Sequence, residues 1–169
     1  MSNICVTMSA AVTMVRSFEQ HVNDSGVTFV YNRDFQEKKA RHLKGIRFLH
    51  MSKRRKTKRQ RQKIDAVINA RVMAWNEEML RRERYYDLHG MTKDGAVDYV
   101  RMIMEMISDE EPIEFETGRG LHSTGRVPKI RTELLEIGDG RYGWIVEEHP
   151  KNPGVVVVIK IFNFDFLLK

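Results

Sequence analysis

The sequence lacks the features typical of secreted and membrane-spanning proteins. Its 169 residues include one cysteine, Cys5, which excludes an internal disulfide framework and a zinc site built from several cysteines. No run approaches the ~18 consecutive apolar residues needed to span a bilayer, so no membrane partner is expected. The apolar stretch ICVTMSAAVTMV has no basic segment ahead of it, so a secretory signal is not expected either. The simplest expectation is a reducing compartment, either the cytoplasm or the nucleus.

Charge is distributed unevenly along the chain. The net charge is +6, but residues 1–32 carry 1 Lys or Arg against 2 acidic residues, residues 33–84 carry 18 against 6, and residues 85–169 carry 10 against 15. A strongly basic segment is therefore joined to a mildly acidic C-terminal half. This asymmetry indicates a polyanionic partner.

The basic charge is densest between Lys53 and Lys63, where eight of eleven residues are Lys or Arg and none is aromatic. Three interpretations remain open: a nuclear-import signal, an arm that contacts phosphates, and the solvated face of a helix. An arm of this kind would add affinity through counterion release without reading base sequence. The residues expected to contact phosphates are Lys53, Arg54, Arg55, Lys56, Lys58 and Arg59.

The pattern of apolar residues and of turns divides the chain into four segments. These are a basic, poorly ordered N-terminal extension of unknown role (1–50), a basic arm with an amphipathic helix (51–84), an α/β unit (85–162) and an apolar tail (163–169). Within the extension, Val27–Tyr31 has the composition of a short strand. In the second segment, apolar residues recur at helical spacing from Ile64 to about Arg84.

From Tyr85 onward, strand and helix patterns alternate. The expected elements are a strand at 85–89, a helix capped by Thr92, a strand at 113–117, a helix from Pro128 to Gly138, and strands at 142–148 and 155–161. The order β-α-β-α-β-β predicts a two-layer α/β domain. A core of that size is marginal by itself, so the preceding helix is expected to help close it.

Asp87 and His89 form the first candidate for chemistry. They are two residues apart on the predicted strand, so both are expected on one face of the sheet. A carboxylate beside an imidazole can fix its tautomer and raise its basicity. The same pair also occurs as a purely structural feature, and spacing alone does not separate the two interpretations.

The second candidate is the loop Thr117-Gly118-Arg119-Gly120, which leads through His122 and Ser123 towards a helix. Its glycines would allow close approach of a ligand, N–H groups at a helix start favour an anion, and Arg119 could bind a phosphate. A tight strand-to-helix turn is the alternative explanation. Both candidates follow strands at one sheet edge, so the sequence predicts that they converge on a single phosphate.

Together the two motifs resemble those of the Smr (small MutS-related) domain family. The family's D-L-H-G motif corresponds to Asp87–Gly90, its T-G-x-G loop to Thr117–Gly120 with His122 and Ser123 following, and the likeness extends over residues 84–162. This resemblance implies a β-α-β-α-β-β fold and nucleic-acid binding. It also implies endonuclease activity that nicks DNA or cuts RNA, including messenger RNA on stalled ribosomes.

The available side chains favour RNA as the substrate. Asp87 and Glu116 alone would be a thin ligand set for the divalent metals that DNA hydrolysis commonly uses, whereas RNA supplies its own 2′-hydroxyl nucleophile. His89, oriented by Asp87, would be the base, His122 or a water the acid, and Arg119 with the loop N–H groups would hold the phosphate. A requirement for a divalent metal stays open. The rival hypothesis is a non-catalytic module that binds nucleic acid or ribosomes.

Overall fold

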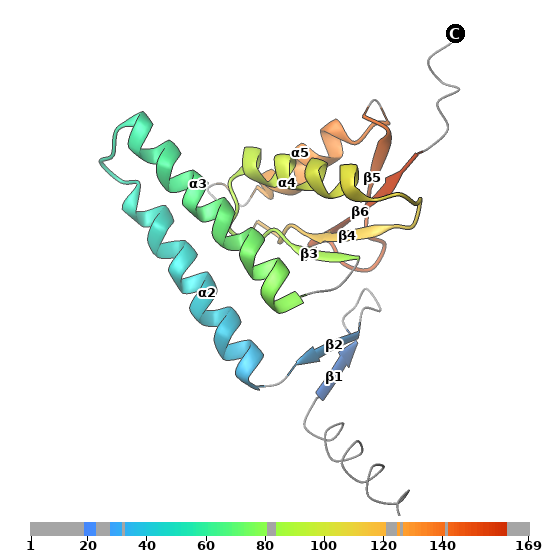
Figure 1. Cartoon of the computed structure of the whole chain (residues 1–169), viewed down its shortest axis with the longest axis horizontal. Coiled ribbons are helices and arrows are strands. Elements are labelled where there is room, and N and C mark those ends of the chain that lie inside the picture. Colours follow the sequence, from blue (N-terminus) through green and yellow to red (C-terminus); the bar gives the residue numbers. More distant parts are fainter. Residues whose placement is uncertain are drawn as a thin grey trace, which may run out of the picture.

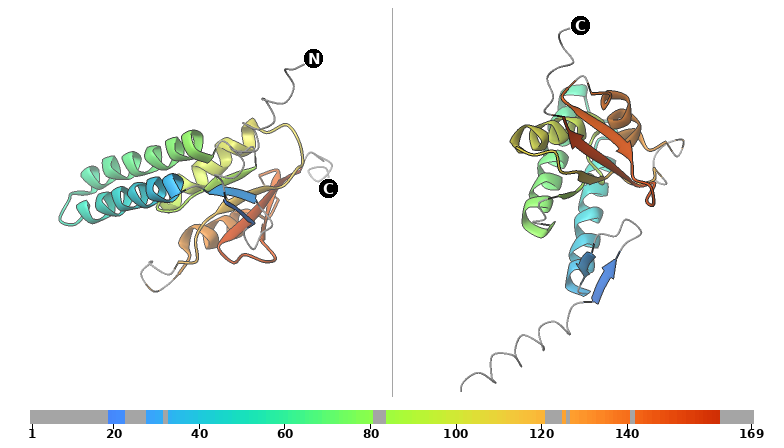
Figure 2. Two further views of the ribbon diagram at one scale, coloured as in Figure 1. Left: turned by 90° about the horizontal axis from the view of Figure 1, so that it is seen from below. Right: turned by 90° about the vertical axis from the view of Figure 1, so that its right-hand side faces the viewer.

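The computed structural model describes residues 19–22, 28–31, 33–80, 84–120, 125, 127–140 and 142–161. In this part of the chain the fold is mixed α/β, as predicted, with a long helical hairpin beside a four-stranded sheet (Figures 1 and 2). None of the helices described is both long and apolar enough to cross a lipid bilayer.

A short β-hairpin precedes the helices. Strand β1 (Glu19–Val22) pairs antiparallel with β2 (Thr28–Tyr31), with Glu19 opposite Tyr31 and Val22 opposite Thr28. This hairpin forms a sheet separate from the four-stranded one. The strand predicted at Val27–Tyr31 is confirmed over β2.

The helical hairpin consists of α2 (Arg33–Ser52) and α3 (Lys58–Trp75), which run side by side in opposite directions (Figure 1). Thr57 begins α3 with a capping box: its hydroxyl accepts the Gln60 N–H at 3.3 Å, and the Gln60 side chain accepts the Thr57 N–H at 3.0 Å. A π-helical turn, η1 (Asn76–Leu80), continues α3.

Two sequence expectations for this region are corrected. Weak order is wrong for residues 33–50, which form most of α2. Ile46 is the one hydrophobic residue of this helix that is fully buried, so its sequence carries little of the apolar pattern by which a helix is predicted. The predicted helix starts before Ile64, because the capping box places the first turn at Lys58. The basic run is therefore not a separate arm but the turn of the hairpin and the first turns of α3.

The C-terminal half contains the predicted sequence of strands and helices. Its elements are β3 (Tyr85–Asp87), α4 (Lys93–Met106), β4 (Ile113–Glu116), α5 (Lys129–Ile137), β5 (Trp144–Glu148) and β6 (Val155–Lys160). The strand order in the sheet is β3-β4-β6-β5, with β3 parallel to β4 and the other pairs antiparallel. As predicted, Thr92 caps α4 by accepting the Gly95 N–H at 3.1 Å.

One face of the sheet forms the core with α4 and α5. Along β4, Ile113 and Phe115 are fully buried, while Glu114 and Glu116 point to the opposite face. The same hydrophobic cluster includes Ile46 of α2 and the α3 residues Ile68 and Val72. The hairpin therefore helps to close the core, as expected for so small an α/β layer.

Candidate active site

Asp87, the last residue of β3, is held in place through both its backbone N–H and its backbone carbonyl. Its N–H donates to the Asn76 side-chain oxygen at 2.7 Å, and its carbonyl accepts from the Asn76 side-chain nitrogen at 2.8 Å. Asn76 lies where α3 passes into η1 and is itself buried. It therefore acts as a partner for the edge strand β3 and fixes the Asp87 backbone.

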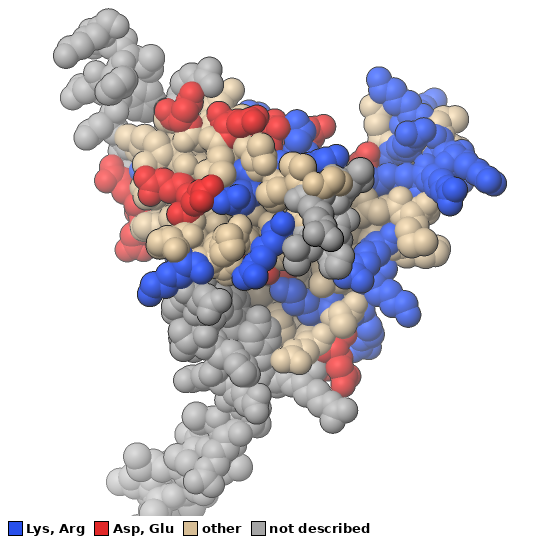
Figure 3. Space-filling model, turned by 180° about the vertical axis from the view of Figure 1, so that it is seen from behind, with Lys and Arg blue, Asp and Glu red and all other residues tan. Residues whose placement is uncertain are grey.

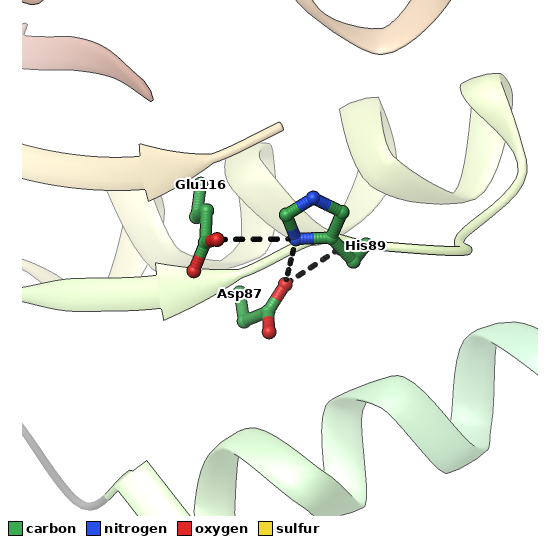
Figure 4. A group of neighbouring side chains, drawn as sticks. All are labelled: Asp87, His89 and Glu116. Atoms are coloured by element: carbon green, nitrogen blue, oxygen red, sulfur yellow. Dashed lines mark hydrogen bonds and ion pairs between the residues drawn. The ribbon is translucent and has the colours of Figure 1, made fainter. Parts of the chain in front are cut away.

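The Asp87 carboxylate holds His89. Oδ1 of Asp87 accepts the backbone N–H of His89 at 2.8 Å and lies 2.8 Å from its ring Nδ1 (Figure 4). The prediction that both residues share one strand is wrong, because β3 ends at Asp87 and His89 lies in the following turn. The two side chains nevertheless meet, because the carboxylate itself closes that turn.

This contact determines the tautomer of a neutral His89. An ionised carboxylate can only accept hydrogen bonds, so Nδ1 carries the proton and Nε2 has the free lone pair. Nε2 faces the glycine loop: a Cβ placed on Gly118 would lie 2.5 Å from it, and Gly118 has a φ of +77°. Gly118 thus allows the imidazole to lie directly against the loop.

Glu116 is the third member of the cluster. The parallel register pairs Asp87 with Glu116, which places both carboxylates on one sheet face, and Oε1 of Glu116 lies 3.4 Å from His89 Nδ1. The Tyr85 hydroxyl donates to the other Glu116 oxygen at 2.5 Å. The apolar–acidic alternation of β4 signals Glu116 in the sequence, but nothing there signals the role of Tyr85.

Lys39 reaches the same cluster from α2. Its ammonium lies 3.1 Å from Oδ2 of Asp87 and 3.6 Å from Oε2 of Glu116. Sequence reasoning missed this residue, because α2 was not anticipated and 48 positions separate Lys39 from Asp87. Only the tertiary fold brings them together.

These neighbours shift the pKa values of the pair in opposite directions. Burial alone would raise the pKa of Asp87, but hydrogen bonds from His89 and the Lys39 charge outweigh it and leave the pKa well below the ordinary value. Burial alone would lower the pKa of His89, but the Asp87 hydrogen bond and the charges of Asp87 and Glu116 outweigh it and raise the pKa above 6.5. The site therefore favours an ionised Asp87 beside a basic imidazole.

The glycine loop differs from the predicted phosphate cradle. The N–H groups of Thr117 and Gly118 both donate to the Gly154 carbonyl, at 2.8 and 3.0 Å, so the expectation that they hold a phosphate is wrong. The Thr117 hydroxyl donates to the same carbonyl at 3.1 Å. These bonds tie the loop to the turn before β6 and give it a fixed position beside His89.

The rest of the loop approaches α5. Gly120 has a φ of +70°, and a Cβ there would lie 2.6 Å from the Pro128 nitrogen, so only glycine fits at this crossing. Arg119 is exposed next to Gly118, where its side chain is accessible to a ligand. His122 and Ser123 lie outside the described residues.

The basic run forms the tip of the helical hairpin, away from the Asp87–His89 cluster. We call residues 53–63 the basic tip; the projection at the upper right of Figure 3 is rich in Lys and Arg. Five of the six predicted phosphate contacts are exposed there: Arg54, Arg55, Lys56, Lys58 and Arg59. The sixth, Lys53, pairs with Asp65. At 1.5 Å per residue, the path along α2 from Lys39 to Lys53 is roughly 20 Å.

A divalent metal has candidate ligands here but little room. Ligand atoms of Asp87, His89 and Glu116 lie within 4.8 Å of one another. However, the Lys39 ammonium already contacts both carboxylates, and Nδ1 of His89 is hydrogen-bonded to Asp87. A metal held by all three residues would have to break the bond between His89 and Asp87 and would lie close to the positive charge of Lys39, so these residues as arranged do not fit a resident metal ion.

Comparison with known proteins assigns no family. No family model matches the chain, and no significant match was found among curated proteins or among solved structures. The Smr resemblance therefore stays a prediction based on the residues of the two motifs.

Proposed function

We propose that this protein is an Smr-type endonuclease that cleaves RNA in preference to DNA. The observation that carries the proposal is the Asp87–His89 pair, in which Nδ1 is bound to a buried carboxylate and Nε2 faces the Gly118 loop. That is the arrangement required for a general base with a defined tautomer. The element order β-α-β-α-β-β supports Smr membership as part of the same proposal.

His89 would begin the reaction on the substrate's own hydroxyl. Nε2 takes the proton of the 2′-hydroxyl as that oxygen attacks the adjacent phosphorus, and Asp87 stabilises the imidazolium that forms. The bond from phosphorus to the 5′-oxygen breaks, and the leaving oxygen takes a proton from His122 or a water. The products are a 2′,3′-cyclic phosphate and a 5′-hydroxyl.

The carboxylates of the site support RNA over DNA. A DNA nuclease must activate a water, commonly with metals held by several carboxylates. Here Asp87 and Glu116 already share the Lys39 ammonium. Positive charge on the phosphate would come from Arg119, since the Thr117 and Gly118 N–H groups are engaged by Gly154.

The basic tip would provide binding energy away from the chemistry. Its exposed Lys and Arg residues can contact backbone phosphates without reading sequence. Ribosome-bound messenger RNA, in the cytoplasm, is one substrate compatible with such a surface; a nuclear RNA is the other.

The proposal is tested with end-labelled single-stranded RNA, matched DNA, and the same RNA carrying one 2′-deoxynucleotide at the cleaved position. We expect the unmodified RNA to be cleaved and the DNA and the 2′-deoxy-substituted RNA to stay intact. Cleavage should persist in EDTA and leave a 2′,3′-cyclic phosphate end. His89→Ala should abolish cleavage while RNA binding persists, because the basic tip is untouched. Cleavage of the 2′-deoxy substrate at the same bond would refute the 2′-hydroxyl route.

A non-catalytic binding module is the second candidate. The double contact of Asp87 with His89 would equally serve to close the turn after β3, and this observation favours the alternative. If the wild-type protein binds RNA but cuts neither free RNA nor ribosome-bound messenger RNA, and His89→Ala binds equally well, the binding module is the correct assignment.

A further inference from the structure

We propose that Lys39 is a positioning residue of this site and that its ammonium takes the place of a divalent cation between Asp87 and Glu116. Its Nζ lies 3.1 Å from one carboxylate and 3.6 Å from the other. This inference deepens the proposed function, because a side chain of the protein itself would supply the positive charge of the site. It rests on the proposed function only where RNA cleavage is used to test it.

The helix that carries Lys39 is anchored on both sides of it. One turn earlier, Phe35 packs against Trp75, with ring centroids 5.7 Å apart. Two turns later, Ile46 lies against Gly90, where a Cβ would come within 2.5 Å of the isoleucine methyl. These contacts fix α2 relative to the turn that holds His89.

His50 adds a polar tie at the same turn. Its Nε2 lies 2.7 Å from the Gly90 carbonyl, directly after His89. The packing of α2 therefore fixes the backbone of Lys39 beside the site. Its side chain is 24% exposed, so the ammonium is partly shielded from water.

Two carboxylates on one sheet face would repel each other without a cation between them. The Tyr85 hydroxyl donates to Glu116, but it carries no positive charge. The ammonium supplies that charge and so holds both side chains beside the imidazole. Without the ammonium, the carboxylates of Asp87 and Glu116 would offer oxygen ligands to a divalent cation, in a cluster whose ligand atoms already lie within 4.8 Å of one another.

Lys39→Met keeps the aliphatic stem and removes the charge. Lys38→Met is the matched control, because Lys38 lies next to it on α2 and pairs only with Asp34 one turn away among the ion pairs described. Lys39→Arg keeps the cation, and Lys39→Gln is a second neutral variant in case Lys39→Met fails to fold. Folding of each variant is checked by circular dichroism.

The probe is Co²⁺, whose absorbance spectrum reports its coordination. We expect Lys39→Met or Lys39→Gln to bind one Co²⁺ about tenfold more tightly than wild type, because the positive charge that repels the ion is gone. The control and Lys39→Arg should bind as weakly as wild type. Adding Glu116→Gln to the neutral variant should abolish the gain.

The proposal is overturned if the neutral variants gain no Co²⁺ affinity, or if Lys38→Met gains as much. In cleavage assays with EDTA, Lys39→Met should lose activity and Lys39→Arg should retain it. If wild-type protein cuts no RNA at all, the proposed nuclease fails, while the Co²⁺ titration still decides the role of Lys39.

Discussion

Replacing Gly95 with alanine should destabilise the protein, although Ala is normally the better helix residue. Gly95 lies in the first turn of α4, where a Cβ would come within 1.9 Å of the Asn69 side-chain nitrogen and 2.3 Å of its carbonyl carbon. The whole Asn69 amide would have to move. That amide is held by Thr92, whose N–H donates to it at 3.0 Å and whose hydroxyl accepts from it at 2.9 Å.

The magnitude follows from these contacts. Two lost hydrogen bonds cost about 1 kcal/mol each, and forcing a methyl group into a packed site adds about 1–3 kcal/mol. The gain in helix propensity on replacing Gly by Ala offsets about 1 kcal/mol. We therefore expect the free energy of unfolding to fall by about 2–4 kcal/mol.

Urea denaturation of Gly95→Ala, Asn69→Ala and the double variant measures this effect. The double variant has no steric conflict at this position. Its loss of unfolding free energy should therefore be clearly smaller than the sum of the losses in the two single variants. If Gly95→Ala is instead stabilising, as helix propensity alone predicts, the close contact between Gly95 of α4 and Asn69 of α3 is refuted.

Two further predictions concern pH and salt. The pKa of Asp87 is lowered below 3.8, so the stability that its carboxylate contributes is present above about pH 4 and is lost as the pH falls through the native pKa. The pKa of His89 is raised above 6.5, so the stability that its imidazolium contributes is present below about pH 6.5 and is lost as the pH rises through the native pKa. His89→Gln should therefore lower the free energy of unfolding most near pH 5, which denaturant titrations at several pH values would measure. A loss that does not change with pH would contradict the ionic pairing of Asp87 with His89. Substituting Arg54, Arg55 and Arg59 of the basic tip by Gln should reduce the slope of log K against log salt for single-stranded RNA by about 2, at about 0.7 per phosphate contact. Fluorescence anisotropy across a salt series measures that slope, and an unchanged slope would show that the tip does not contact the RNA.

The helical hairpin links the two surfaces of the proposed nuclease. The basic tip lies at one end of α2 and α3, while Lys39 and Asn76 meet the Asp87–His89 cluster towards the other. A substrate that contacts both must span roughly 20 Å, estimated from the helical rise between Lys39 and Lys53. This separation favours a polynucleotide over a small phosphodiester.

Local sequence patterns are enough to predict most of the α/β unit. Periodicity and turn residues predicted α4 with its Thr92 cap, the strand pattern of β4, and the order of all six elements from β3 to β6. These features depend on neighbours within a few positions, which a linear pattern records. The pairing of Asp87 with His89 was also within reach, because only Leu88 lies between them.

The groups that complete the site are brought there by long-range packing and not by a local pattern. Lys39 and Asn76 come from α2 and from the end of α3, and neither carries a local signal for its role. The glycine loop shows the same limit, because the N–H groups of Thr117 and Gly118 could have faced a phosphate but are bound to the Gly154 carbonyl. The contacts of Lys39 and Asn76 with the site depend on how the hairpin packs on the sheet. That packing depends on shape complementarity at residues such as Gly90 and Gly95, which no pattern along the sequence specifies.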